Sequence, residues 1–209
     1  DLSFQNGIAS AHHKPFVLFL GRLQKVKGCL ELLQAYTNWS GRKDFDLVFD
    51  GLFEDEVYEQ KIKTWINQHN LNASVHFKGL VSGSIKNALL NQAKLFVLPS
   101  FSEGFPVSVL EAMQSGCPLL ISCFTGLHEV MEEKKAALIC NPTVESITNN
   151  LENFSKMNQE QLSEMVSRST ELFESLFSRK KVMTNYADLY MNLIPSNTRL
   201  TSIENLADL

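Results

Sequence analysis

The chain has 209 residues, of which 44% are hydrophobic and 20% are charged, and its formal net charge is −4. This composition is ordinary for a globular domain with a core, and it lacks both the overall basic charge that attracts nucleic acid and the roughly 18 consecutive apolar residues of a membrane-spanning helix. The four cysteines form no C-x-x-C pair and none lies at zinc spacing from a histidine, a pattern typical of reduced cysteines in a cytosolic protein.

Short apolar runs alternate with helical patterns along the chain. Strands are expected at 16–20, 45–49, 74–77, 95–98, 118–122 and 137–139. Helices are expected at 29–39, 54–69, 82–93, 106–116, 127–131, 143–154, 159–177 and 179–193. Because continuous apolar strands separated by helices are typical of a parallel sheet covered on both faces, we expect an α/β fold: a Rossmann-like three-layer α/β/α domain with extra C-terminal helices.

The ends of the chain are expected to lie outside this domain. Residues 1–14 carry the turn signal Asn6-Gly7 and precede the helix breaker Pro15, so they are expected to be irregular. Residues 195–209 are polar and are expected to form a loose tail. The domain itself is therefore expected over residues 15–194.

A basic loop follows the first expected strand. Gly21 permits a sharp turn, and Arg22 and Lys27 flank the loop ahead of the next helix. Arginine presents a planar fork to phosphate and lysine adds a point charge, so the loop is suited to a diphosphate. The sequence is neither a Walker A loop nor a G-x-G-x-x-G motif, and the alternative is that these side chains are simply solvated.

Two glutamates, eight residues apart, follow the fourth expected strand. Glu103 lies in the turn after the strand, and Glu111 lies in the helix expected to begin at Pro106. Strand ends of α/β sheets are where ligands bind, and the free N–H groups at a helix start favour an anion. Glu111 is expected about 7 Å further along the helix axis than Pro106. Its carboxylate can accept two hydrogen bonds from a vicinal diol such as a ribose. The alternative is a turn residue and a surface helix residue.

These motifs, in this order and at these separations, resemble the C-terminal, donor-binding half of a retaining GT-B glycosyltransferase of family 4. The G-R-L and K-G pairs of that family match residues 21–23 and 27–28, and its Glu-x7-Glu segment matches 99–113. Its later glycine turn with a following glutamate matches 126–129, and the resemblance covers residues 16–193.

The chain also departs from the family pattern. Thr125 and Ala137 stand where glycines are common, and Phe53 stands where the turn after the second strand often has its second glycine. Phe53 narrows the side of the site where the nucleotide is expected, so the sequence does not decide which base the site prefers. None of these changes removes a charged group from the expected site.

The resemblance implies a role for each site residue. Arg22 and Lys27 would bind the donor diphosphate and stabilise its growing charge, Glu103 would face the donor sugar, and Glu111 would hold the ribose. The implied catalytic residues are Glu103, Arg22 and Lys27. The implied donor-binding residues are Gly21, Arg22, Lys27, Gly79, Glu103, Gly104, Phe105, Pro106, Val107 and Glu111.

The implied activity is transfer of a sugar from a UDP- or GDP-sugar to an acceptor, with retention, in the synthesis of cell-surface polysaccharide or lipopolysaccharide. The resemblance implies no metal and no other cofactor, no nucleic-acid partner, and a cytoplasmic enzyme; it leaves open peripheral association with the inner face of the membrane. The alternatives are a nucleotide- or sugar-binding module without turnover, and a GT-B epimerase or sugar-phosphate synthase.

A GT-B enzyme has a second Rossmann-like half, which binds most of the acceptor. Residues 6–8 resemble the crossover between the halves, and 179–193 resemble the helix that returns towards the other half. The N-terminal acceptor domain is therefore expected to be absent. We expect the chain to bind nucleotide sugar weakly and to transfer little or nothing alone.

Overall fold

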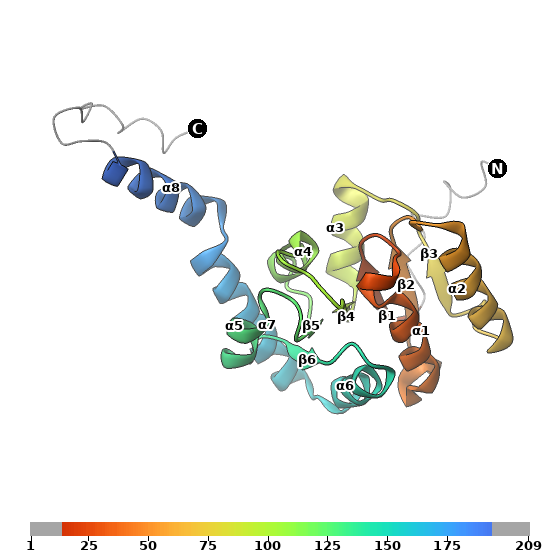
Figure 1. Cartoon of the computed structure of the whole chain (residues 1–209). Coiled ribbons are helices and arrows are strands. Elements are labelled where there is room, and N and C mark those ends of the chain that lie inside the picture. Colours follow the sequence, from red (N-terminus) through yellow and green to blue (C-terminus); the bar gives the residue numbers. More distant parts are fainter. Residues whose placement is uncertain (1–13, 194–209) are drawn as a thin grey trace. The chain divides into compact units, whose positions relative to one another are not determined.

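The computed structural model describes residues 14–193, and its central feature is a six-stranded sheet (Figure 1). The strands are β1 (Phe16–Leu20), β2 (Asp46–Asp50), β3 (Val75–Phe77), β4 (Leu95–Leu98), β5 (Leu119–Ser122) and β6 (Leu138–Cys140). Their spatial order is β3-β2-β1-β4-β5-β6, and every neighbouring pair is parallel. The predicted parallel α/β sheet is confirmed.

The chain order reverses between β1 and β4. Strands β2 and β3 follow β1 to one side of the sheet, and β5 and β6 follow β4 to the other side. In open α/β sheets, this switch point leaves a crevice outside the carboxyl ends of the strands, where ligands bind. The loops that follow β1 and β4 are therefore the first place to look for a site.

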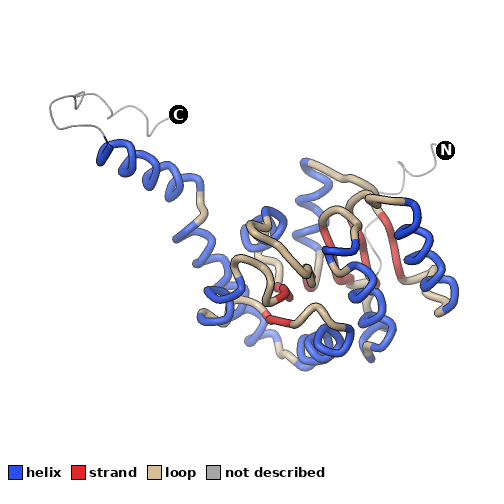
Figure 2. The backbone as a smooth tube through the Cα atoms, viewed as in Figure 1, coloured by secondary structure: helices blue, strands red, loops and turns tan. Residues whose placement is uncertain are grey.

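Helices α1 to α5 lie between successive strands, and three further helices of the described chain follow the last strand (Figure 2). The helices are α1 (Cys29–Asn38), α2 (Glu56–Gln68), α3 (Gly83–Gln92), α4 (Val107–Gln114), α5 (His128–Glu133), α6 (Val144–Lys156), α7 (Gln159–Leu176) and α8 (Arg179–Leu193). Each predicted helix is present, with ends shifted by a few residues. The 3-10 helices η2 (Lys25–Lys27) and η3 (Ser40–Lys43) were not predicted, because a single turn is too short to show an apolar period.

The chain divides into two compact units, one ending at Glu171 and the other beginning at Leu172, within α7. The sheet belongs to the first unit. The predictions for residues 1–13 and 195–209, including the crossover at 6–8, lie outside the described residues.

The middle of the sheet is the core of the first unit. All four side chains of β4 are at most 1% exposed, as expected for a strand covered on both faces. Phe49 of β2 packs on Phe19 of β1 at 5.5 Å between ring centroids and stacks on Phe77 of β3 at 5.3 Å. Burying a side chain of this size contributes about 1.5–3 kcal/mol, so these strands hold their carboxyl ends firmly in place.

The unit that begins at Leu172 contains α8, which leaves large hydrophobic side chains exposed. They are Met183, Tyr186, Leu189, Tyr190 and Leu193. Their spacing of three and four residues places them along one side of the helix. Such an exposed row of side chains is typical of a helix that packs against another part of a protein.

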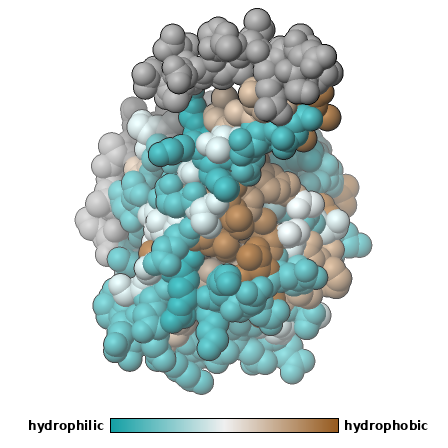
Figure 3. Space-filling view, turned by 90° about the vertical axis from the view of Figure 1, so that its left-hand side faces the viewer, coloured by the Kyte–Doolittle hydropathy of each residue, from teal (hydrophilic) through white to brown (hydrophobic). Residues whose placement is uncertain are grey.

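Figure 3 shows that hydrophobic residues (brown) also gather among hydrophilic ones (teal) on the face of the molecule that it draws.

Gly28 allows the loops after β1 and β4 to meet. Its φ is +70°, and a Cβ there would lie 2.3 Å from the carbonyl oxygen of Pro99. The Phe101 N–H donates to the carbonyl of Val26 at 2.8 Å, which joins the same two loops directly. Only glycine fits this left-handed position so close to another backbone.

Gly28→Ala is therefore expected to lower the free energy of unfolding by about 3 kcal/mol, because left-handed strain of about 1 kcal/mol adds to steric overlap of about 2 kcal/mol. Gly79→Ala is the matched control, since Gly79 has the same φ of +70° but no atom within 4 Å of its added Cβ. It should cost only about 1 kcal/mol. Urea unfolding measures both variants, and equal losses would show that the loop contact does not matter.

Candidate functional site

The loop after β1 is tied to the loop after β2. The Gly21 N–H donates to the carbonyl of Asp50 at 2.9 Å, and Leu23 forms a parallel bridge with Phe53. This places the predicted residues Arg22 and Lys27 at the carboxyl edge of the sheet. Lys27 ends the 3-10 helix η2, directly before Gly28.

Lys27 and Glu103 form an ion pair across the switch point. Their side chains are 17% and 16% exposed, so the pair is largely shielded from water. The two residues are 76 positions apart in the sequence and come from the loops after β1 and β4. The structure thus brings together two of the three predicted catalytic residues.

Arg22 lies apart from that pair. Its side chain is 73% exposed, and its guanidinium is 3.9 Å from the carboxylate of Glu54. An exposed ion pair of this length contributes little to stability, so the Arg22 side chain can reorient at small cost.

The loop after β5 supports the Glu103 backbone. The Glu103 N–H donates to the carbonyl of Phe124 at 3.1 Å, and its own carbonyl accepts from the N–H of Gly126 at 2.8 Å. Glu103 also forms a parallel bridge with Thr125. Three loops, those after β1, β4 and β5, therefore hold the Glu103 side chain in one place.

The helix α4 begins beside this carboxylate. Pro106 precedes it as N-cap and offers no side-chain hydrogen bond, and the first N–H of the helix to find a helical acceptor is that of Val109. The N-terminus therefore presents unbonded N–H groups and the positive end of its dipole. The flanking Phe105 and Val107 side chains are exposed, at 57% and 60%.

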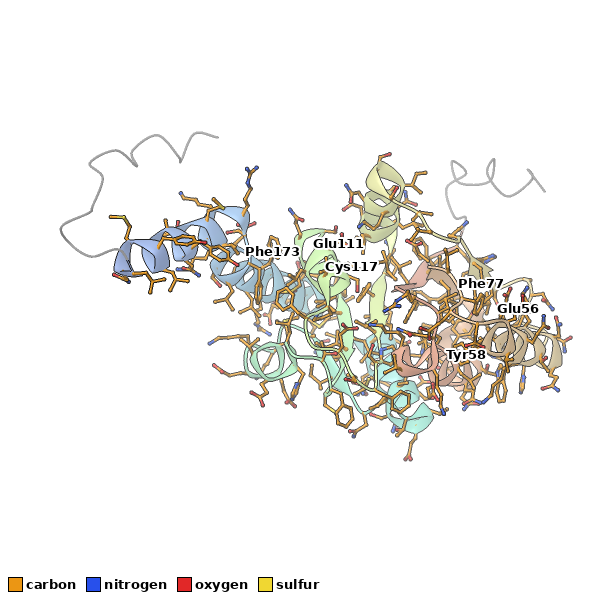
Figure 4. The ribbon with its side chains drawn as sticks, turned by 45° about the horizontal axis from the view of Figure 1, so that its top comes forward. Glu56, Tyr58, Phe77, Glu111, Cys117 and Phe173 are labelled. Carbon is orange, nitrogen blue, oxygen red and sulfur yellow. The ribbon has the colours of Figure 1, made fainter. Side chains whose placement is uncertain are left out.

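Glu111 forms an ion pair with Lys86 of α3. Figure 4 labels Glu111 on α4. The two side chains are 28% and 25% exposed, so both are partly buried while still reachable from solvent.

Asp50 is the buried carboxylate next to this pair. It ends β2, is 2% exposed, and accepts the Val81 N–H at 3.1 Å. Burial raises the pKa of the Asp50 carboxyl, and Glu111 acts in the same direction, whereas the Val81 N–H and the Lys86 ammonium lower it. Asp50, Lys86 and Glu111 thus form one electrostatic cluster.

The sequence analysis did not single out Lys86 or Asp50. Asp50 carried a usable signal, because a carboxylate that ends an apolar strand directly before a glycine lies at the binding edge of a parallel sheet. Lys86 carried none, since it is a single lysine within a helix and its partner is 25 residues away.

Gly79 lies in the loop after β3, next to the loop after β2. Its carbonyl accepts the Gly51 N–H at 2.7 Å. Phe53 of the adjacent loop packs against Phe77 at 5.3 Å between ring centroids, which places an aromatic surface on this side of the sheet edge.

Residues 14–193 contain no group of three or more His, Cys, Asp or Glu side chains that could hold a metal ion. None of the helices described is long and apolar enough to cross a membrane.

The site therefore combines two chemistries at one sheet edge. Lys27 and the N-terminus of α4 can attract an anion, and Arg22 can reach towards it from the same loop. Glu103 and Glu111 can accept hydrogen bonds from hydroxyl groups. A ligand with a central phosphate group and hydroxyl groups on both sides fits this arrangement.

Comparison with known proteins agrees with this chemistry. The family model described as "Glycosyl transferases group 1" matches residues 3–171. Among curated proteins, the O-antigen chain mannosyltransferase B of Escherichia coli is 31% identical over 131 residues, which cover 61% of this chain and 33% of that protein. The chain spans about a third of the length of this and other curated relatives.

Two solved structures show the same fold. The C-terminal domain of the glycosyl transferase group 1 protein LpcC from Francisella tularensis matches 79% of this chain and 87% of that chain, with a TM-score of 0.71 and 19% identity. HepE from Anabaena, solved with UDP and glucose, matches 90% of this chain and 49% of that chain, with a TM-score of 0.75 and 18% identity. The sheet domain has the fold of a GT-B C-terminal half.

Proposed function

Because this chain belongs to the group 1 glycosyltransferases, we propose that it binds the donor for transfer of a sugar from a UDP- or GDP-sugar to an acceptor with retention. The observation that carries the proposal is the meeting of the Lys27–Glu103 pair, the N-terminus of α4 and the Glu111–Lys86 pair at the carboxyl edge of one sheet. Lys27 and the N-terminus of α4 can bind an anion, and Glu103 and Glu111 can accept hydrogen bonds from hydroxyl groups.

The diphosphate is proposed to bind at Lys27 and the N-terminus of α4. An ammonium has three N–H donors, so Lys27 can keep Glu103 as a partner while it donates to a phosphate oxygen. Arg22 is proposed to leave Glu54 and complete the anion site with its planar fork. Breaking the glycosidic bond builds charge on the diphosphate, and these prearranged groups would stabilise that charge.

The two ends of the donor are proposed to meet the two glutamates. Glu103 lies next to the diphosphate-binding lysine, so it would face the sugar that is transferred. Glu111, further along α4, would accept the ribose hydroxyls. The loop that contains Gly79 would lie near the base. HepE, whose fold the chain shares, was solved with UDP and glucose, which supports UDP as the first nucleotide to test.

The relatives support a proposal for the acceptor and the pathway. O-antigen chains are cell-surface polysaccharides, and the mannosyltransferase B that acts on them matches 61% of this chain. We infer that the whole enzyme, acting in the cytoplasm, extends a surface polysaccharide or lipopolysaccharide. The acceptor would bind mainly to a part of the polypeptide outside this chain.

Isothermal titration of the 209-residue chain with UDP, GDP and their sugars tests the proposal. We expect one of the two nucleotides to bind, and we expect its sugar conjugate to bind as well when it is titrated separately. An equal response to ribose 5-phosphate alone would show that the site recognises only phosphate. No heat with any of the compounds would overturn the proposed function.

A further inference from the structure

The ammonium of Lys86, which pairs with Glu111, has no role in the proposed function. Lys86 Nζ binds Glu111 Oε1, and the pair joins α3 to α4. Lys86 is the fourth residue of α3, close to the helix N-terminus, where the dipole disfavours a cation. Its position is therefore explained by the carboxylates that face it, rather than by its own helix.

The Lys86–Glu111 bond leaves hydrogen-bonding capacity on both partners. A carboxylate has about four lone-pair positions, and Lys86 uses one of them on Oε1. The side chain of Glu111 is 28% exposed, so a ligand can reach it without breaking the bond. A diol and the ammonium can therefore share the carboxylate.

Asp50 links this pair to the loop expected near the base. Its carboxylate accepts the Val81 N–H at 3.1 Å, and Val81 follows Gly79 by two residues. Asp50 also interacts electrostatically with both Lys86 and Glu111. Without the ammonium, two carboxylates would repel each other on the nucleoside side of the site.

We propose that Lys86 is a positioning residue that fixes the Glu111 carboxylate for the two hydroxyls of the donor ribose. This inference rests on the proposed function, because it needs a ribose at Glu111. Lys86 holds one carboxylate oxygen and balances the charge of Asp50, so that Glu111 meets the diol in one orientation. Lys86 thereby sets how strongly the site selects a ribonucleotide over an analogue without the two hydroxyls.

The test compares UDP with 2′,3′-dideoxy-UDP by titration calorimetry, with GDP and 2′,3′-dideoxy-GDP measured in parallel. The wild-type chain should bind the ribonucleotide at least roughly tenfold more tightly than its dideoxy form. Lys86→Met keeps an unbranched stem of similar length without the charge. In this variant the ratio of ribonucleotide affinity to dideoxynucleotide affinity should fall below about threefold. Lys86→Arg should restore most of it, and Lys94→Met, at an exposed lysine just after α3, should leave it unchanged.

The double variant Lys86→Met/Glu111→Gln separates positioning from a general loss of structure. If Lys86 acts through Glu111, the double variant should have the same ratio as Glu111→Gln alone. A ratio in Lys86→Met equal to that of the wild type would overturn this inference and leave the proposed function standing. If the wild-type chain bound a ribonucleotide and its dideoxy form with equal affinity, Glu111 would have no role at the ribose, and this inference would be overturned. No nucleotide binding at all would overturn the proposed function itself.

Discussion

Replacing Lys27 with methionine is expected to weaken UDP binding about 100-fold, because a charge-assisted hydrogen bond to phosphate contributes about 2–3 kcal/mol. Removing the ammonium also leaves the Glu103 carboxylate uncompensated beside the diphosphate, and that repulsion acts in the same direction. The side chains of Lys27 and Glu103 are each about one-sixth exposed, so solvent screens this effect less than it would at the surface. If GDP is the nucleotide that binds, the same loss is expected with GDP.

Lys25→Met is the matched control for this prediction. Lys25 lies on the same 3-10 helix and is exposed, so its variant should bind UDP within about twofold of the wild type. Uridine, which has no phosphate, should lose much less affinity than UDP in Lys27→Met. If uridine and UDP lost affinity equally, Lys27 would be shaping the site as a whole and not binding the diphosphate.

The sheet was predictable because its strands are short, apolar and buried on both faces. Leu95–Leu98 shows the reason: four consecutive core residues between polar turns leave few alternatives to a central strand. The carboxyl edge followed from the same prediction, since all the loops that leave parallel strands in one direction meet there. Loop residues such as Lys27 and Glu103 could therefore be assigned to one region before the strand order was known.

The partners of those residues could not be predicted. Lys27 and Glu103 meet only because β1 lies next to β4, and that adjacency depends on how the whole sheet assembles. Arg22, predicted to act with Lys27, instead lies 3.9 Å from Glu54 in the loop after β2. Lys86 has no sequence pattern that points to Glu111. Local patterns place a residue on an element, whereas side-chain pairing is decided by which elements become neighbours.

Replacing Glu103 with glutamine is expected to have opposite effects on UDP and on its sugar conjugate. In the free protein, Glu103 neutralises Lys27, so UDP must share that ammonium with a carboxylate of its own charge. Glu103→Gln removes this competition and should tighten UDP binding roughly tenfold, a gain of about 1.4 kcal/mol, within the range of one charged hydrogen bond. If Glu103 also faces the sugar, the conjugate should gain less than UDP, so the ratio of conjugate affinity to UDP affinity should fall.

Glu103→Gln should also change the stability of the protein, because without ligand this variant leaves the ammonium of Lys27 partly buried and without an anionic partner. We expect Glu103→Gln to lower the unfolding free energy by about 1–2 kcal/mol without ligand, and saturating UDP to recover most of that loss. Glu164→Gln is the control, since Glu164 pairs with Arg168 on α7 and is about half exposed, and it should change neither quantity by more than about 0.5 kcal/mol. Weaker UDP binding in Glu103→Gln would instead make Glu103 part of the diphosphate site, with its carboxylate holding Lys27 in the binding position.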